Sequence, residues 1–297
     1  TDNSFAGVWH FAPSDTFADA TSNSNDGTNS GSVLRSAGAI GNARSFNIST
    51  TNDVVTVPSH GSLESLESIT LSAWFNRQAN PHCYNGRIIS KPNSSTAEDY
   101  GIMLDCEAEG ADLITRIRDQ GNDNVELSST TTFTTTGWNY GVATWDQDSI
   151  RVYINGDWDA SAFQEGDSTY NSADNMTFGR HDNSSNDRYF RGYIDEPRVE
   201  NVARSADWIK LCYENQRATG QSLLEYPSWG NEDYATDWDS STTLYLNTNA
   251  TTGADVSGTE TDFPVLVRLS SSTFWPEGSQ SDGTDIRFSK ADGTHLY

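Results

Sequence analysis

Aromatic residues beside polar side chains are the first candidates for chemistry in this sequence. Trp158 stands in a polar setting, Asp157-Trp158-Asp159, directly after the tight-turn signal Asn155-Gly156. Saccharide binding needs an exposed aromatic face beside amide or carboxylate groups that bond hydroxyls. Two further loop groups share this composition, and their candidate ligand-binding residues are His82, Tyr84 and Asn85, and then His181, Asp182, Asn183, Arg188 and Tyr189. For each, the alternative is an ordinary loop aromatic.

Enzymatic chemistry has weaker signals. Glycoside hydrolysis needs two carboxylates at a fixed separation. The nearest acidic sets, which have the wrong spacing for one cleft strand, are Glu64 with Glu67 and Asp195-Glu196 with Glu200. The five His residues are scattered and no Gly-x-Ser-x-Gly motif is present. A zinc site needs clustered His and Cys, but only His82 and Cys83 are adjacent. We therefore expect a protein that is not an enzyme.

The net charge of the chain limits the kinds of molecule that it can bind. The 297 residues include 42 Asp and Glu against 18 Lys and Arg, which gives a net charge of −24. A surface this negative repels phosphate backbones and acidic membrane surfaces, so nucleic acid is excluded as the main partner. Cations, neutral polymers and basic partners remain. Carboxylates and Asn carbonyls are hard oxygen ligands, which makes Ca²⁺ the metal that the sequence best suits.

The elements that would position these residues are β-strands. Short stretches rich in Val, Ile, Thr, Tyr and Trp alternate with clusters of Gly, Asn, Asp and Ser, a pattern typical of an all-β sandwich. The predicted strands are 8–11, 44–46, 54–57, 69–76, 86–91, 100–105, 112–118, 139–146, 150–154, 176–180 and 191–199. Ser205 resembles the N-cap of one short helix that ends near Asn215 or Gln216.

Two domains are expected, residues 1–218 and residues 219–297. The composition changes after the predicted helix to a linker-like mixture of Gly, Ser, Pro, Asp and Trp, and strand-like patterns resume at 243–247, 263–269 and 285–289. No apolar run is long enough for a membrane segment. The chain opens at Thr1 with no Met, which is expected after removal of a signal peptide or in a trimmed chain. It closes at Tyr297 on a strand-like run with no terminating turn, so we expect this chain to be part of a longer one.

The three cysteines leave their pairing open. If the hairpin around residues 92–99 pairs symmetrically about position 94.5, Cys83 faces Cys106, and cross-strand neighbours are close enough for a disulfide. Two separate reduced thiols are the alternative. Cys212 lies in the helical segment and is expected to be a small buried hydrophobe.

Taken in order, the segments of the first two thirds resemble a LamG-type domain of the concanavalin A-like jelly-roll superfamily. The resemblance covers roughly residues 5–216, and the matching segments are 8–11, 25–28, 41–46, 69–74, 88–91, 138–146, 152–156, 192–199 and 203–209. It implies a jelly-roll β-sandwich in which Trp9, Trp74 and Trp138 take packing positions. Laminarinases share this jelly roll but carry a Glu-x-Asp-x-x-Glu strand, which is absent here.

The resemblance also implies a metal position. Related folds hold a structural Ca²⁺ where the N-terminal loop meets the final strand, which would bring Asp15, Asp19 or Asp26 beside Asp195. Asp195 follows an apolar residue on a strand, where a carboxylate is costly unless a cation or hydrogen-bond donors compensate it. Solvation and turn formation are the alternative role of the loop aspartates.

Residues 235–297 are similar to a bacterial domain of unknown function, through segments 262–269 and 281–288. In some envelope proteins that domain is joined to a TolQ/ExbB-type proton channel. The sequence therefore predicts a secreted, cell-surface or periplasmic protein with a jelly roll and a second, smaller β-sandwich. Its expected role is non-catalytic glycan binding or adhesion; a protein-contact region of a channel-coupled envelope assembly is the alternative, and a glycoside hydrolase is less supported.

Overall fold

The computed structural model describes residues 4–11, 17–30, 34–46, 53–78, 86–92, 98–105, 111–121, 123–133, 137–181, 188–217, 223–225, 243–268, 288–289 and 295–296. The chain divides into two compact units, Thr1–Ala218 and Thr219–Tyr297, and each is described by itself. Among the described residues, no helix has the length and apolar character needed to cross a bilayer.

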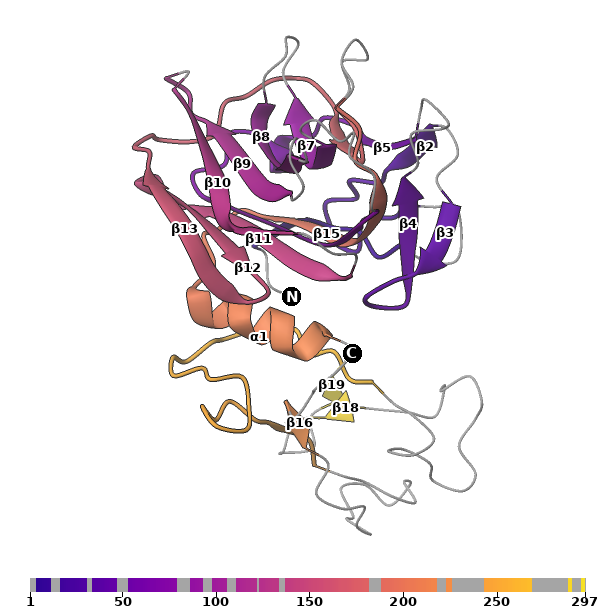
Figure 1. The fold of residues 1–297 in the computed structure, drawn as a ribbon, viewed down its shortest axis with the longest axis vertical. Coiled ribbons are helices and arrows are strands. Elements are labelled where there is room, and N and C mark those ends of the chain that lie inside the picture. Colours follow the sequence, from indigo (N-terminus) through magenta and orange to yellow (C-terminus); the bar gives the residue numbers. More distant parts are fainter. Residues whose placement is uncertain are drawn as a thin grey trace. The chain divides into compact units, whose positions relative to one another are not determined.

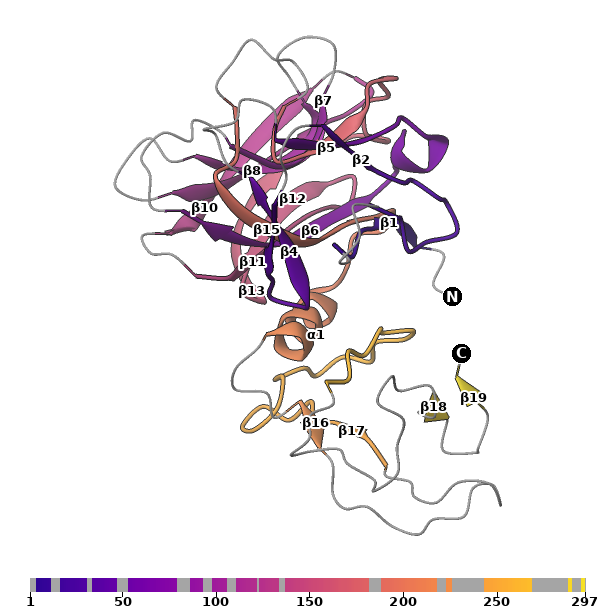
Figure 2. The ribbon, with the colours of Figure 1, turned by 90° about the vertical axis from the view of Figure 1, so that its right-hand side faces the viewer.

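The first unit is a sandwich of two antiparallel sheets (Figures 1 and 2). The order of the first sheet is β13 (Asp157–Phe163), β12 (Ser149–Ile154), β11 (Asn139–Trp145), β6 (Ile69–Arg77), β15 (Gly192–Glu200), β4 (Asn42–Phe46) and β3 (Leu34–Ala37), and β1 (Phe5–Val8) also pairs with β15. The order of the second sheet is β10 (Asn124–Thr132), β9 (Asp112–Arg118), β8 (Glu98–Asp105), β7 (Gly86–Pro92), β14 (Met176–Phe178), β5 (Val54–Val57) and β2 (Thr28–Ser30).

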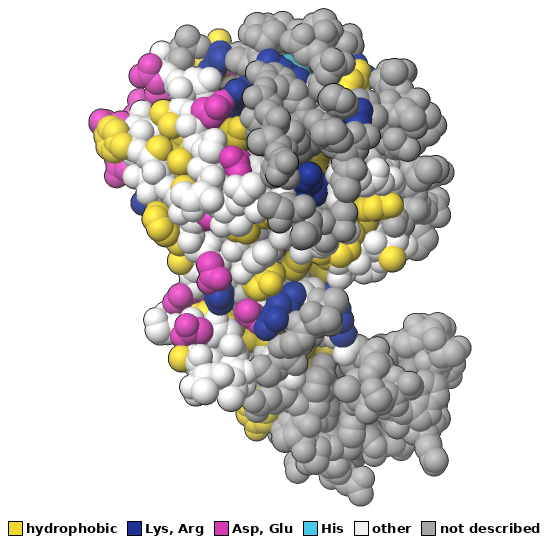
Figure 3. Space-filling view, in the orientation of Figure 1, with side chains coloured by type: hydrophobic (Ala, Val, Ile, Leu, Met, Phe, Trp, Pro, Cys, Tyr) yellow, Lys and Arg dark blue, Asp and Glu magenta, His cyan; other side chains and the backbone are white. Residues whose placement is uncertain are grey.

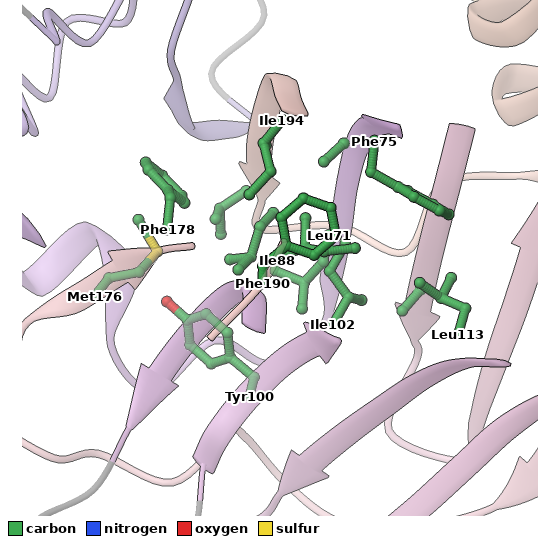
Figure 4. Close-up of a cluster of buried hydrophobic side chains, with 14 of the residues drawn as sticks. Leu71, Phe75, Ile88, Tyr100, Ile102, Leu113, Met176, Phe178, Phe190 and Ile194 are labelled. Carbon is green, nitrogen blue, oxygen red and sulfur yellow. The ribbon is translucent and has the colours of Figure 1, made fainter. Parts of the chain in front are cut away.

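The core lies between the two sheets. Strand alternation sends every second side chain inward, so Leu71 and Phe75 of β6 meet Ile88 and Ile102 of the second sheet, as Figure 4 shows. Trp9 is fully buried there and packs edge-on against Phe178. Burial of such side chains contributes roughly 1.5–3 kcal/mol each, which offsets the low apolar content of the sequence.

Helix α1 (Ala206–Gln216) covers the outer face of the first sheet. The Ser205 hydroxyl accepts a hydrogen bond from the backbone N–H of Trp208, which caps the first turn. Trp74, on the outer face of β6, stacks on Tyr213 and donates from Nε1 to Gln216 Oε1 at 2.7 Å. Trp74 therefore packs between sheet and helix rather than between the sheets. A single 3-10 turn, η1 (Gly61–Leu63), is also present in the described part.

The described strands of the second unit form two short antiparallel pairs. β16 (Leu224–Glu225) pairs with β17 (Tyr245–Leu246), and β18 (Phe288–Ser289) pairs with β19 (His295–Leu296). Residues 263–268, expected as part of a strand, have no regular secondary structure. The sequence between β17 and this segment instead forms a loop in which Asn247 and Asn249 accept several backbone hydrogen bonds.

The all-β jelly-roll sandwich expected from the sequence is confirmed. One register differs from the symmetric hairpin that the sequence suggested: Gly86 pairs with Leu104, where symmetry about 94.5 would pair it with Met103. Bulges in the β7–β8 ladder cause the shift. Cys83 and Cys106 lie outside the described residues, so their disulfide stays a prediction. Cys212 is buried and has a free thiol.

Candidate functional site

Trp158 is held at the start of the edge strand β13 by the turn that precedes it. Asn155 and Gly156 have φ of 53° and 86°, the left-handed values that a two-residue hairpin turn requires. Trp158 pairs with Tyr153 across the ladder. Since Val152 and Ile154 face the core, Tyr153 and Trp158 face outward. The Trp158 side chain is 60% exposed, so much of the indole is open to solvent.

The residue before this tryptophan, Asp157, takes part in an ion pair. Lys210 of helix α1 extends its Nζ to Asp157 Oδ1 at 2.6 Å. Gly156 makes the approach of the helix close, because a Cβ at this position would lie 3.1 Å from the Lys210 Cδ and 3.0 Å from the Tyr213 Cβ. The turn, the strand and the helix therefore present one aromatic face, one carboxylate and one ammonium to solvent.

Asp159 fixes the direction of the strand at this point. The ladder shifts register between Trp158 and Ala160, so Asp159 is the extra residue of a β-bulge. Its two carboxylate oxygens accept hydrogen bonds from the backbone N–H and the hydroxyl of both Thr130 and Thr131, on β10 of the other sheet. The edge strands of the two sheets are thus joined directly behind Trp158.

The second candidate group is only partly described. His181 is buried, and its neighbour Arg180 places its guanidinium 5.0 Å from the centre of the half-buried Tyr189 ring. A β-bridge joins Arg180 and Tyr189. His181 and Tyr189 therefore contribute to packing inside the first unit, and only Tyr189 is partly exposed. Asp182 and Asn183, and the whole first group of His82, Tyr84 and Asn85, lie outside the described residues.

Asp19 is compensated by hydrogen-bond donors. Its Oδ1 accepts from the backbone N–H of Val8 and Thr21, and its Oδ2 accepts from the Thr21 hydroxyl and the backbone N–H of Asn25, all within 2.7–3.0 Å. Asp26 lies beside it and accepts from the Asp19 N–H. These donors do for the buried carboxylate what a cation would otherwise do.

Asp195 is tied to a different loop. It is fully buried on β15, and its Oδ2 accepts from the backbone N–H of Ile40 at 2.8 Å, in the turn between β3 and β4. Gly38 permits this approach, since a Cβ there would overlap with Oδ2. Burial raises the pKa of Asp195 to about 7.

The expected calcium set is therefore not assembled by the described residues. No group of three or more His, Cys, Asp or Glu side chains with metal-binding geometry occurs among them. Asp15 lies outside the described residues, so a calcium ion that it shares with Asp19, Asp26 or Asp195 stays a prediction.

The carboxylates considered for hydrolysis are engaged in structure. Glu196 is buried in a β-bulge of β15, 2.7 Å from His10 Nδ1, and accepts from the Arg198 guanidinium at 2.8 Å. Burial alone would raise the pKa of Glu196, but the bond to His10 and the charge of Arg198 hold it below its usual value. Glu200 pairs with Arg204 in the same way. The pKa shifts of Asp195 and Glu196 are opposed, but Asp195 accepts from the Ile40 N–H and Glu196 contacts His10 and Arg198, so both carboxylates are held in structural contacts.

Sequence reasoning named Trp158 as a candidate and did not name Lys210. The polar flanks and the preceding Asn-Gly turn identify the tryptophan locally. The ion pair joins residues 53 positions apart, on a strand and a helix, and no local signal gives that contact.

Comparison with known proteins places this geometry in a family. The family model described as "Concanavalin A-like lectin/glucanases superfamily" (Laminin_G_3) matches residues 49–210, more than half of the chain. A search of the curated proteins returned no match.

Solved structures of similar fold include binding domains. The binding domain of Paraclostridial Mosquitocidal Protein 1 aligns with 15% identity and a TM-score of 0.57, over 76% of this chain and 57% of that one. The botulinum neurotoxin serotype G binding domain aligns with 14% identity and a TM-score of 0.57, over 76% and 55%. The chain thus spans little more than half of either domain.

A third structure matches over nearly its whole length. Domain 4 of AbnA, a GH43 extracellular arabinanase from Geobacillus stearothermophilus, in complex with arabinotriose, aligns with 19% identity and a TM-score of 0.53, over 69% of this chain and 96% of that one. At these identities the likeness concerns the fold, and the family match carries the assignment. By its sequence over residues 49–210 and its two-sheet sandwich, the chain belongs to the concanavalin A-like lectin/glucanases superfamily, in its Laminin_G_3 family.

Proposed function

We propose that the first unit is a non-catalytic carbohydrate-recognition module that binds a saccharide at Trp158. The exposed indole on β13, framed by the Asp157–Lys210 ion pair, is the observation that carries this proposal. A sugar ring has an apolar C–H face that can stack on an indole and hydroxyls that bond charged groups at its rim. The frame supplies both kinds of contact from three rigid elements.

The comparisons support the class of function. The two toxin domains are described as binding domains, and domain 4 of the arabinanase is described in complex with arabinotriose. For botulinum neurotoxin type C, another protein of similar fold, cell entry is described as dependent upon interaction with two ganglioside molecules. A location outside the cytoplasm is part of the proposal, because polymeric glycans are met there.

Binding of soluble polysaccharides by affinity electrophoresis tests the proposal. We expect Trp158→Ala to weaken binding by at least about tenfold, because one stacked aromatic contributes on the order of 1 kcal/mol beyond its buried area. Phe163→Ala is the matched control, since Phe163 is 72% exposed on the same strand and lies outside the ion-paired frame. Both variants should keep the wild-type unfolding midpoint.

Two results would contradict the proposal: an affinity that Trp158→Ala leaves unchanged, and no binding to any polysaccharide on a broad glycan array. Repeating the array with a chelator tests the separate calcium prediction. An adhesion role, and the alternative of contacts within a TolQ/ExbB-type envelope assembly, stay predictions that no contact among the described residues favours.

A further inference from the structure

We infer that the saccharide bound at Trp158 is uncharged and that two adjacent hydroxyl groups on it bridge the Asp157–Lys210 pair. This inference rests on the proposed function and names the ligand class of the same site. It excludes uronates, sialylated glycans and sulfated glycans as ligands.

The ion pair has bonding capacity left after its partners meet. Lys210 Nζ carries three donors and Asp157 two acceptor oxygens, and their mutual contact uses one of each. The side chains are 23% and 75% exposed, so both remaining sets face solvent. One sugar hydroxyl can donate to Asp157 while its neighbour accepts from Lys210. The 2.6 Å separation of Nζ and Oδ1 resembles the separation of the two oxygens in a vicinal diol.

The charges at the site disfavour an anion. Lys210 is the cation of the frame, and its charge is already balanced by Asp157 at hydrogen-bond distance. Asp159 adds a second carboxylate on the residue after Trp158, bonded to neutral donors only. A carboxylate or sulfate on the ligand would therefore meet net negative charge. Figure 3 shows acidic and apolar side chains together along the left margin of the visible face, where Figure 1 places β13 and β10.

The whole chain reinforces this local effect. Its net charge is −24, and several of its cations are buried in the sandwich, among them Arg44, Lys91 and Arg198. Long-range attraction of an anionic polymer is therefore absent at low salt, where it would be strongest. A neutral ligand is not repelled by the negative charge of the protein, so the salt concentration should hardly change its affinity.

Matched pairs of polysaccharides, one neutral and one a uronate, test the inference at low and high salt. Wild-type protein should bind the neutral polymer with an affinity that salt hardly changes, and should not bind polygalacturonate. Asp157→Asn and Lys210→Gln should each weaken neutral binding by about tenfold, because each removes a charge-assisted hydrogen bond. Asp157→Lys should create polygalacturonate binding that rises at low salt.

Asp148→Lys is the control for charge reversal. Asp148 is exposed on the turn between β11 and β12, so this variant changes the net charge by the same amount at another place. If it creates the same polygalacturonate binding as Asp157→Lys, the site is not selective and the inference is wrong. Circular dichroism and unfolding midpoints confirm that both exposed substitutions leave the fold intact.

The two proposals fail in different ways. Wild-type binding of polygalacturonate that Trp158→Ala abolishes would overturn the uncharged ligand and leave glycan recognition at Trp158 standing. Neutral binding that depends on Trp158 but is unchanged in both Asp157→Asn and Lys210→Gln would overturn the diol bridge. Binding that does not depend on Trp158 would overturn both.

Discussion

Several single carboxylates in this acidic chain are satisfied by neutral donors. Asp19 accepts three hydrogen bonds within its own loop and a fourth from Val8 of β1, and Asp159 accepts four from two consecutive threonines. Backbone N–H groups that aim at a carboxylate stabilise its charge without a counter-ion. A chain with 42 acidic and 18 basic residues can in this way place aspartates at loops and bulges that must hold their shape.

The contribution of Asp159 to stability can be measured. We expect Asp159→Ala to lower the free energy of unfolding by about 1–2 kcal/mol, because it removes four partly exposed hydrogen bonds that join β13 to β10. Denaturant unfolding followed by fluorescence gives the value. Asp148→Ala, on an exposed turn, should change it by less than about 0.5 kcal/mol. Equal effects of the two substitutions would show that the hydrogen bonds from Thr130 and Thr131 to Asp159 do not stabilise the fold.

Elements whose side chains alternate between core and surface were predictable from the sequence. β5 and β9 begin and end at the residues expected, because each is a short run rich in β-branched residues between turn signals. β10 was missed. Its segment, Asn124–Thr132, is mostly exposed and carries only Val125 and Leu127 toward the core, so its pattern resembles a polar loop. β13 was expected only as the partner that the Asn-Gly turn implies.

The candidate site likewise has a part that the sequence predicts and a part that only the structure shows. Trp158 and the turn before it follow from local sequence, whereas the bulge at Asp159 and the approach of Lys210 depend on how α1 docks against the first sheet. Bulges shift register by one residue without a strong sequence signal, as the β7–β8 ladder also shows. Contacts between distant elements therefore had to come from the structure.

Docking of α1 depends on its cap as well as on its apolar face. We expect Ser205→Ala to cost about 1 kcal/mol of stability, because the hydroxyl accepts from the Trp208 N–H at 3.0 Å. The same variant should weaken saccharide binding slightly, since Lys210 lies on this helix. Unfolding midpoints and affinities are compared with those of Ser161→Ala, which removes an exposed hydroxyl on β13. A midpoint equal to that of the control would contradict the capping role.

For the molecule as a whole, acidity and burial together set the pH dependence of folding. Burial raises the pKa of Asp99 to about 6, and that of Asp195 to about 7. In the unfolded chain both carboxyls lose their protons near pH 4. Between these values the folded state holds more protons than the unfolded state, so stability falls as the pH rises. Repulsion within a chain of net charge −24 acts in the same direction.

We therefore expect the free energy of unfolding to be larger at about pH 5 than at about pH 8. Asp195→Asn keeps the hydrogen bond from Ile40 and removes the titration, so it should reduce the difference. Glu196, whose pKa is lowered, contributes an opposite slope only in the more acidic range. Chemical denaturation at both pH values measures the effect, and greater stability at the alkaline value would contradict it.

The link that Asp159 makes between β13 and β10 also bears on how copies of this chain meet. Both are terminal strands of their sheets, and terminal strands offer unpaired amides on which a foreign strand can add. Two of the β10 amides, those of Thr130 and Thr131, are already occupied by the carboxylate. The charge that stands there also repels a second acidic chain. One side chain thus joins the two edge strands and occupies two amides on which a foreign strand could otherwise add.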